Sequence, residues 1–465
     1  MRTTALVRNE PLAAVVQETG WTQQQLAAAF VRVAAEVGAE ELLSTGRSQV
    51  SMWIAGTYPK GRVPLILCET LSRRLQRPIT TADIGLGGPM SGAVTASEWH
   101  VDTLTGLVDL GSSNVDLERR QLLAGAAYSV SGLALPGEEW WDRAPARAAS
   151  RHSTANREVG AAEVSAVREM TTFYQRRDQR AGGLDGRTAL YQYVGDDVAT
   201  YVGGRFRSEK ALREMLSAAA EAVYVAGWMS FDASHHEVAR RSFTLATKLA
   251  AEAADGPLVG HILRAMAHQA TDLGHPKQGA DLAMESVARK RYMHAAPRER
   301  ALLGVVQARS LAANGQRRDA VAALLRAEGD LRAAEPGDDE PSRVWFFREA
   351  SLAHESARTL WALGDLDGAL REFKRSVLTR KTDTFSRTHA VTLGYMGAVQ
   401  VRQGNVEAAC ATWERALEAM DGIHSGRARE TVVTMRRLLS PYRRRGVTAA
   451  AEIDERARMI LGRVA

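Results

Sequence analysis

Apolar residues recur along most of this chain at spacings of three and four, which is the period of a helix that buries one face. The pattern runs almost without interruption from about residue 158 to the C-terminus, and shorter stretches of it fill residues 1–85. No segment shows the strict alternation of apolar and polar residues that predicts a half-buried strand. We therefore expect an all-α protein.

A turn phrase returns three times in the C-terminal half. It reads Leu-Gly-Asp-Leu-Asp-Gly-Ala-Leu at residues 363–370, Arg-Gln-Gly-Asn-Val-Glu-Ala-Ala at 402–409 and Ala-Asn-Gly-Gln-Arg-Arg-Asp-Ala at 313–320. Each copy has a Gly suited to a turn and, five residues later, an Ala on the following helix. Small residues at such positions let two antiparallel helices pack closely and stack on further pairs.

The register of this repeat can be counted over five units. The small residue recurs at intervals of 41, 40, 49 and 40 residues, at Ala239, Ala280, Ala320, Ala369 and Ala409. Four residues later a bulky side chain is expected to fill the contact, at Phe243, Met284, Leu324, Phe373 and Trp413. The long interval contains a Pro- and Gly-rich loop at 335–341. The pattern resembles the tetratricopeptide repeat, with units about six residues longer than the usual ~34.

These patterns divide the chain into five segments. We expect a helix-turn-helix bundle at 1–85, a linker with connecting helices at 86–157 and divergent helical pairs at 158–219. Tetratricopeptide-like repeats follow at 220–421, and capping helices at 422–465. The predicted fold is thus an N-terminal helix-turn-helix bundle followed by an α-solenoid.

Two motifs in the N-terminal segment carry a second resemblance. Gly-Trp-Thr-Gln-Gln-Gln-Leu-Ala at residues 20–27 resembles the start of a helix-turn-helix of the phage-repressor (XRE-like) type. Gly-Arg-Ser-Gln-Val-Ser-Met-Trp-Ile-Ala-Gly at 46–56 resembles its recognition helix, with Val50 and Ile54 facing the core of the bundle. The family's turn is tight, whereas residues 37–45 add length here. Either the helix before the turn is long or the turn itself is expanded.

The resemblance implies contact with double-stranded DNA. Gln can bond adenine, and Arg guanine, through two hydrogen bonds each. Basic side chains just beyond the recognition helix suit a phosphate contact. The candidate DNA-binding residues are Thr22, Gln23, Gln24, Arg47, Ser48, Gln49, Ser51, Met52, Lys60 and Arg62. The alternative is a small helical bundle that serves dimerisation or packing.

The inner face of the predicted array is a candidate ligand surface. In tetratricopeptide repeats this face comes from fixed positions of each first helix, and here those positions mix aromatic, Arg, Gln, Asp and His residues. Arg can pair with the carboxylates of a peptide and aromatic rings can hold its side chains. The candidate ligand-binding residues are Tyr224, Trp228, Gln269, Asp272, Arg309, His354, Arg358 and Trp361. Packing between helices is the alternative for each of them.

Composition limits the possible partners and cellular compartment of the protein but does not determine its function. A net charge of +6 and a pI near 9.4 permit contact with nucleic acid but do not require it. Two cysteines without a CxxC motif exclude a disulfide framework and suit a reducing cytosol. No run approaches the ~20 apolar residues of a membrane span. A twin-arginine-like stretch at 118–127 lies far from the N-terminus, and we expect a buried Ala-rich helix there.

Three apparent chemical motifs are weak. Residues 182–188 resemble a phosphate loop, but their spacing is one short and Arg replaces the required Lys. His261, His268 and His275 recur every seven residues, yet no carboxylate or cysteine completes a metal site around them. No Ser/His/Asp or Cys/His order is evident. We expect neither a metal, a cofactor nor an enzyme.

The order of parts, a repressor-like reader before a helical array, resembles two groups of bacterial regulators. One comprises peptide-responsive regulators of quorum sensing, and the other comprises actinomycete regulators of development and antibiotic production. The primary hypothesis is therefore a cytoplasmic, homodimeric transcriptional regulator whose array senses a peptide, a small molecule or a protein partner. The rival hypothesis is an adaptor whose repeats bind another regulator and whose N-terminal bundle assists assembly.

Overall fold

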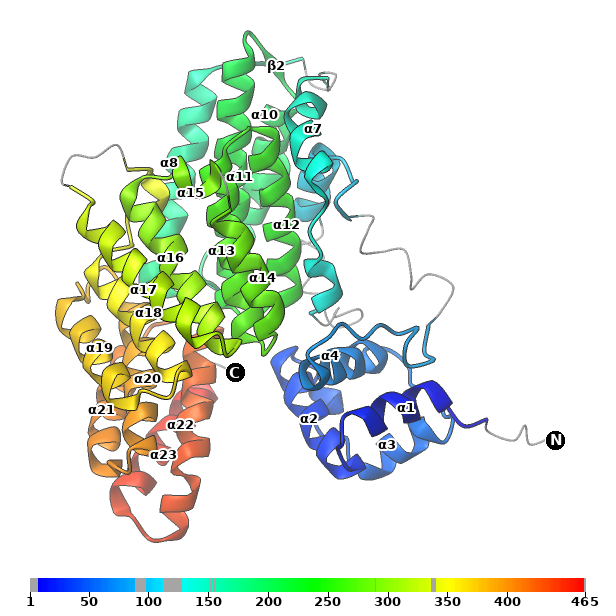
Figure 1. The fold of residues 1–465 in the computed structure, drawn as a ribbon, viewed down its shortest axis with the longest axis vertical. Helices are drawn as coiled ribbons and strands as arrows, with labels where there is room; N and C mark the ends of the chain where they lie inside the picture. Colours follow the sequence, from blue (N-terminus) through cyan, green and yellow to red (C-terminus); the bar gives the residue numbers. More distant parts are fainter. Residues whose placement is uncertain are drawn as a thin grey trace.

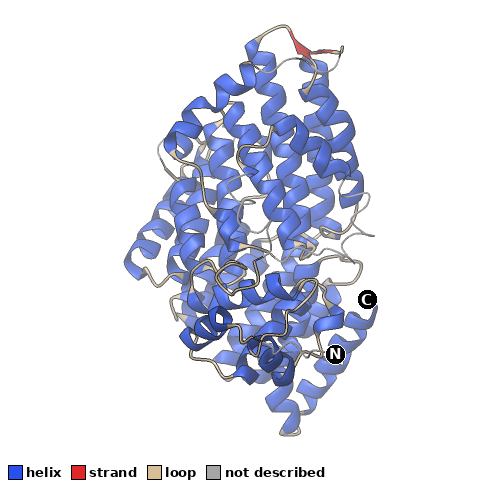
Figure 2. Cartoon of the chain, turned by 90° about the vertical axis from the view of Figure 1, so that its right-hand side faces the viewer, coloured by secondary structure: helices blue, strands red, loops and turns tan. Residues whose placement is uncertain are grey.

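The structure is a computed structural model that describes residues 7–87, 98–112, 128–150, 153, 156–288, 290–335 and 340–463. Within these ranges the regular structure is helical apart from one small parallel sheet (Figures 1 and 2), which pairs β1 (Glu158–Val159) with β2 (Arg205–Phe206). Turns and loops connect the elements. The all-α prediction is confirmed. The two strands were not predicted, because a two-residue strand is too short for alternation to show in the sequence.

The N-terminal bundle is built from four helices and one 3-10 turn. These are α1 (Glu10–Glu18), α2 (Gln23–Glu36), η1 (Glu40–Leu42), α3 (Arg47–Ile54) and α4 (Val63–Leu75). Thr22 caps α2, since its hydroxyl accepts a bond from the Gln25 amide at 3.2 Å. Helix α2 ends at Glu36, so it is the turn that is expanded, and η1 lies within it.

Helix α3 is anchored to the bundle mainly by Trp53. Its ring is 7% exposed and lies 5.3 Å from the ring of Phe30 on α2. Val50 is buried as predicted, whereas Ile54 is only half-buried. The shift toward Trp53 follows from helix geometry, because residues 50 and 53 share one face at a spacing of three.

The segment between the bundle and the array is only partly described. Residues 103–112 are helical, and η2 (Val130–Leu133) and α7 (Glu138–Ala149) follow. Residues 88–97 of the predicted linker segment and the twin-arginine-like stretch at 118–127 lie outside the described residues. No helix among the described residues is long and apolar enough to cross a membrane.

The described residues of the array form six antiparallel helix pairs. Figure 1 shows the pairs following one another in green to red. The pairs are α11 (Glu209–Asp232) with α12 (His236–Glu252), α13 (Gly256–Asp272) with α14 (Pro276–Ser286), α16 (Pro297–Ala313) with α17 (Arg317–Arg332), α18 (Glu349–Ala362) with α19 (Leu366–Thr379), α20 (Ser386–Arg402) with α21 (Val406–Ala419), and α22 (Gly426–Arg444) with α23 (Thr448–Arg463). The first pair begins earlier than the expected residue 220.

One long helix and several short elements lie before and between the pairs. Before them stand α8 (Ala161–Ala181), α9 (Arg187–Tyr193), the π-helical turn η3 (Val194–Val198) and α10 (Ala199–Val202). Between them stand α15 (Lys290–Met293) and η4 (Ser342–Val344). Only α8 in this group is long, and it packs along α11 and α20.

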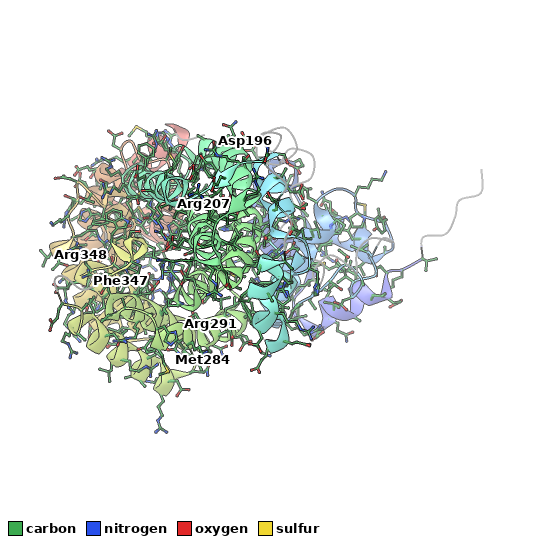
Figure 3. All side chains as sticks on the ribbon, turned by 90° about the horizontal axis from the view of Figure 1, so that it is seen from above. Asp196, Arg207, Met284, Arg291, Phe347 and Arg348 are labelled. Carbon is green, nitrogen blue, oxygen red and sulfur yellow. The ribbon has the colours of Figure 1, made fainter. Side chains whose placement is uncertain are left out.

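The counted register is confirmed in four of the five units. All five alanines are buried, and so are the bulky residues four positions later except Met284. Met284, labelled in Figure 3, is 50% exposed. Helix α14 is short and ends at Ser286, so Leu282 and Ala283 fill the contact in its place. The turn before this helix departs from the repeated phrase, because Gly274 stands six rather than five residues before Ala280.

The array closes on itself through the Gly-rich segment that resembles a phosphate loop. The His424 amide donates to the Ala181 carbonyl at 2.7 Å, and the Leu184 amide donates to the His424 carbonyl at 3.1 Å. Gly182 has φ +94°, and a side chain there would meet the His424 carbonyl oxygen at 2.5 Å. These glycines allow two backbones to touch, so that α8 joins the start of the array to its last pair.

Candidate nucleic-acid interface and ligand cavity

The outer face of α3 is open to solvent. Arg47, Ser48, Ser51 and Met52 are exposed, and Gln49 is half-buried. Figure 1 shows α4 on the side of the bundle that faces the array and α3 on the other side. The side chains that would read base edges are therefore not covered by the array.

Two candidates in this region are already engaged. The Gln49 side-chain oxygen accepts bonds from the Gly46 amide at 2.9 Å and from the Ser48 hydroxyl at 3.0 Å, so it caps α3. The Arg62 guanidinium donates to the Val37 and Gly38 carbonyls at 2.5 and 3.3 Å, which satisfies the C-terminal end of α2. Arg62 thus braces the expanded turn and is withdrawn from the set of phosphate contacts.

The other backbone candidates lie at the surface. Thr22 and Gln24 are exposed and Gln23 is half-buried at the N-terminus of α2, where free amides favour an anion. Lys60 is exposed beyond α3. Residues 7–87 hold eight basic and seven acidic side chains, a net charge of only +1. Any attraction to DNA must therefore come from the local arrangement of these groups.

The bundle touches the array through α4. The His275 Nε2 atom lies 2.8 Å from the Glu69 Oε1 atom, and both side chains are 1% exposed. The Gln76 amide donates to the Gly274 carbonyl at 3.1 Å, and the ring of Tyr128 lies 5.8 Å from that of His275. We call the Glu69–His275 contact the docking bond. It falls at the turn between α13 and α14.

The interior of the closed array contains a cavity of about 70 Å³, enough for several water molecules. Helices α8, α11, α13, α16, α18, α20 and α22 all contribute to it. Its lining is Gln179, Trp228, Arg264, His268, Leu302, Val306, Phe346, Phe347, Ser351, His354, Glu355, Arg380, Phe385, Arg387, Thr388, Val391 and Arg427. Phe347 is buried beside the exposed Arg348, and both are labelled in Figure 3.

Of the predicted ligand residues, Trp228 and His354 line this cavity. Tyr224, Asp272 and Arg309 lie just behind the lining: Tyr224 accepts a bond from Arg264 at 2.5 Å, and Arg309 pairs with Asp272 and, at 3.1 Å, with Glu355. Arg358 also pairs with Asp272, at 3.2 Å.

The two remaining predicted residues do not reach the cavity. Gln269 donates to the His236 carbonyl at 2.7 Å. Trp361 packs its ring against Phe373 and Tyr395, with ring centroids 6.5 and 6.2 Å away. Both act in packing, which was the alternative expectation for them.

Several lining residues were missed by sequence reasoning. The predicted inner face begins at Ser351 in the fourth repeat unit and at Val391 in the fifth. Phe347 and Arg387, which line the cavity, stand four residues earlier, which is one helical turn before these positions. Units about six residues longer than usual leave room for one more turn, which was the available signal. Arg264 and Arg427 lay outside the counted positions altogether.

Burial lowers the pKa of several histidines of the array, and we call His235, His236, His261, His268 and His354 the buried histidines. It lowers the pKa of His236 to about 3 and that of His268 to about 4, with positive charge from Arg73 and Arg309 as the next cause. Burial, then Arg264, lowers the pKa of His261 to about 4. His261 and His268 each lie 3.2 Å from a carboxylate. In the described parts of the chain no three His, Cys, Asp or Glu side chains gather as a metal site would require.

Comparisons with known proteins bear mainly on the N-terminal bundle. Residues 12–87 match the family model described as the SP15 N-terminal domain. No curated protein matches the chain. One solved structure, a "Circular tandem repeat protein with novel repeat topology and enhanced subunit contact surfaces", is similar at 13% identity over 98% of this chain and 96% of that one. Its TM-score is 0.19, so it adds nothing to the fold described above.

Proposed function

We propose that this protein is a DNA-binding transcriptional regulator, in which α3 reads the major groove and the array binds a ligand. The observation that carries the proposal is the exposed polar face of α3, which lies on the side of the bundle away from the docking bond. The XRE-like and tetratricopeptide-regulator resemblance, the cytoplasmic setting and the actinomycete or quorum-sensing context belong to the same proposal.

The chemistry of α3 suits a base-reading role. Arg47 is exposed in the first turn, and no hydrogen bond or ion pair engages it within the described residues. A free guanidinium of this kind can bond the O6 and N7 atoms of guanine. Ser51 lies one turn further on, and the exposed Met52 offers an apolar contact to a thymine methyl group. Gln49 would have to release its capping bond to read a base.

One such bundle reads only half a site, so we propose a homodimer with paired half-sites. A ligand in the array would act on the relative placement of the two bundles. Helix α13 supports this link, because Arg264 and His268 reach the cavity from it while the turn that follows it carries His275 and the docking bond. Occupancy and docking thus involve the same rigid element.

The direct test is selection of bound sequences from a random duplex pool with the full chain, followed by anisotropy titrations. Arg47→Ala should weaken the selected site by about 5- to 150-fold, the equivalent of ~1–3 kcal/mol for a lost two-bond contact. Arg32→Ala is the matched control, because Arg32 is exposed toward the C-terminal end of α2 and its loss removes the same charge. Failure to enrich any sequence would refute the proposal.

The near-neutral bundle favours the adaptor as a second candidate. Proteins that bind DNA usually carry a clear basic patch, and residues 7–87 have a net charge of only +1. In that case Met52 and the other exposed residues of α3 would contact a protein. Two results together would identify an adaptor. The Met52→Asp variant would lose a protein partner that the unmodified chain retains in a pull-down, and the unmodified chain would enrich no DNA sequence.

A further inference from the structure

The cavity has an excess of positive charge. Four guanidiniums line it, those of Arg264, Arg380, Arg387 and Arg427, against the single carboxylate of Glu355. Neutral His268 and His354 do not alter this balance, since burial lowers the pKa of each. A buried cavity of one sign is a site that attracts the opposite charge.

Most of these charges have a partner in the protein. Arg387 pairs with Asp178 at 2.8 Å and with Asp232 at 2.5 Å. Arg427 lies 3.9 Å from Asp272. Glu355 is compensated by Arg309, which lies behind the lining at 3.1 Å.

Arg264 and Arg380 are different. They are 2% and 7% exposed, and neither lies within 4 Å of a carboxylate of the described residues. The partners of Arg264 are all neutral. Arg264 donates to the Tyr224 hydroxyl at 2.5 Å and lies 3.1 Å from the His261 ring. Its guanidinium also stacks over the Trp228 ring, 5.4 Å from the centroid. Arg380 donates to the Ala350 carbonyl at 2.9 Å and to the Ser376 hydroxyl at 3.0 Å. Buried charges in proteins are normally paired, so these two are exceptions.

Each of the two guanidiniums also has an idle donor. The Nε atoms of Arg264 and Arg380 are buried and have no hydrogen-bond partner among the described residues. Burial, and then the charge of Arg387, lowers the pKa of Arg380 to about 10. A carboxylate bound in the cavity beside these guanidiniums would supply the charged partner that the described residues do not.

The rest of the lining is apolar. Phe346, Phe347 and Phe385 contribute aromatic rings, and Leu302, Val306 and Val391 contribute aliphatic side chains. A strongly hydrated ion such as phosphate gains nothing from these walls. A small molecule with an apolar body can use them, because pockets for organic ligands combine apolar walls with a few fixed polar groups.

We propose that the cavity binds a small organic acid, with its carboxylate held by Arg264 and Arg380 and its apolar body packed on Phe346, Phe347 and Phe385. The proposal rests on the ligand-sensing half of the proposed function and is independent of DNA binding. The depth of the two guanidiniums and the small volume favour a compact molecule over an extended peptide. Such an acid would be the ligand that acts on the bundle through α13 in the proposed function, since Arg264 lies on that helix.

The test uses the full chain, free of DNA, with four organic probes, which are phenylacetate, octanoate and their primary amides, and with inorganic phosphate as a fifth. Calorimetric titration and thermal melting at fixed ionic strength should show binding of at least one carboxylate, with a rise in melting temperature that grows with its concentration. The matching amide should bind at least tenfold more weakly. Inorganic phosphate serves as the probe for an oxyanion without an apolar body and should give no rise.

Arg380→Met is the decisive variant, because it keeps the unbranched apolar stem of the side chain and removes the guanidinium and its charge. It should bind the carboxylate at least tenfold more weakly while the free protein melts no lower than the original, since an uncompensated buried charge has been removed. Arg375→Met is the matched control on the neighbouring helix α19. Arg375 pairs with Glu349 outside the cavity, so its loss should leave binding unchanged.

The possible outcomes separate cleanly. Equal binding of amide and carboxylate, equal binding of phosphate, or no binding of either carboxylate at millimolar concentration would overturn the assignment. Unchanged affinity in the Arg380→Met protein would overturn it as well. A carboxylate that binds to a chain without any DNA affinity would leave this inference standing and defeat only the DNA-reading proposal.

Discussion

The docking bond provides a quantitative test of how the bundle is held. Glu69→Ala and His275→Ala each remove one side of a contact that is 2.8 Å long and 1% exposed at both ends. A hydrogen bond to a charged group contributes about 1.5–3 kcal/mol. Arg73 retains its pair with Glu36 at 2.6 Å when Glu69 is lost, so the bundle should remain folded.

The informative quantity is the coupling energy of the double-mutant cycle. We expect the two substitutions to be non-additive by at least ~1.5 kcal/mol, because they act on one contact. Hydrogen exchange of the amides of residues 63–75, followed by mass spectrometry, measures the free energy of opening for α4. Each single variant should lower that free energy, and the double variant should lower it little further.

A second double-mutant cycle shows how large a coupling energy unconnected residues give. Glu69→Ala combined with Arg375→Ala on α19 should be additive within about 0.5 kcal/mol, since the two residues share no partner. If the Glu69–His275 cycle is equally additive, the bundle does not dock on the α13–α14 turn in solution. The link from cavity to bundle would then have no physical basis.

Three further predictions concern stability. Trp53→Ala should destabilise the bundle by about 3–5 kcal/mol, measured by urea unfolding, because it removes the ring that anchors α3; an unchanged midpoint would contradict this packing. Gly397→Ala should destabilise the array by about 1–3 kcal/mol in thermal melts, since the new methyl group would overlap the Trp413 ring, whereas Gly462→Ala meets open space and should not. Stability should also fall as the pH drops from 6.5 to 4, because the buried histidines have folded-state pKa values below their unfolded value and only the unfolded chain takes up their protons. Asp178 and Glu430, whose pKa values burial raises to about 7, offset two of the five, leaving about three protons and ~4 kcal/mol per pH unit near pH 5. A flat profile of unfolding free energy over that range would contradict the burial of these rings.

Periodicity was enough to predict the repeats because their contacts are local. The alanine and the bulky residue four positions later belong to one helix, and Gly397 meets Trp413 only sixteen residues away. The same reasoning failed at Met284, where a short helix shifted the pattern. Local spacing could not reveal how far each helix extends.

The closure of the array and the cavity inside it depend on distant partners. Arg387 meets Asp178 across more than two hundred residues, and Gly182 touches His424. The spacing at 182–188 argues against a phosphate loop, but it gives no sign that these glycines contact the last helix pair. Local spacing could not single out Arg264 and Arg380 for the same reason. What distinguishes them is that no carboxylate of the described residues pairs with them, and that can be seen only in the folded chain.

The most direct measurement of the central claim places a DNA-cleaving group on the reading helix. Ser51→Cys introduces an exposed thiol, while the native Cys68 and Cys410 are buried and their pKa values are raised by burial. An iron chelate attached at position 51 should cut the selected duplex at two positions related by the symmetry of the dimer. The same chelate attached to an Arg32→Cys variant should not cut the duplex. Cutting no greater than that of the free chelate, or equal cutting from both positions, would show that α3 does not enter the groove.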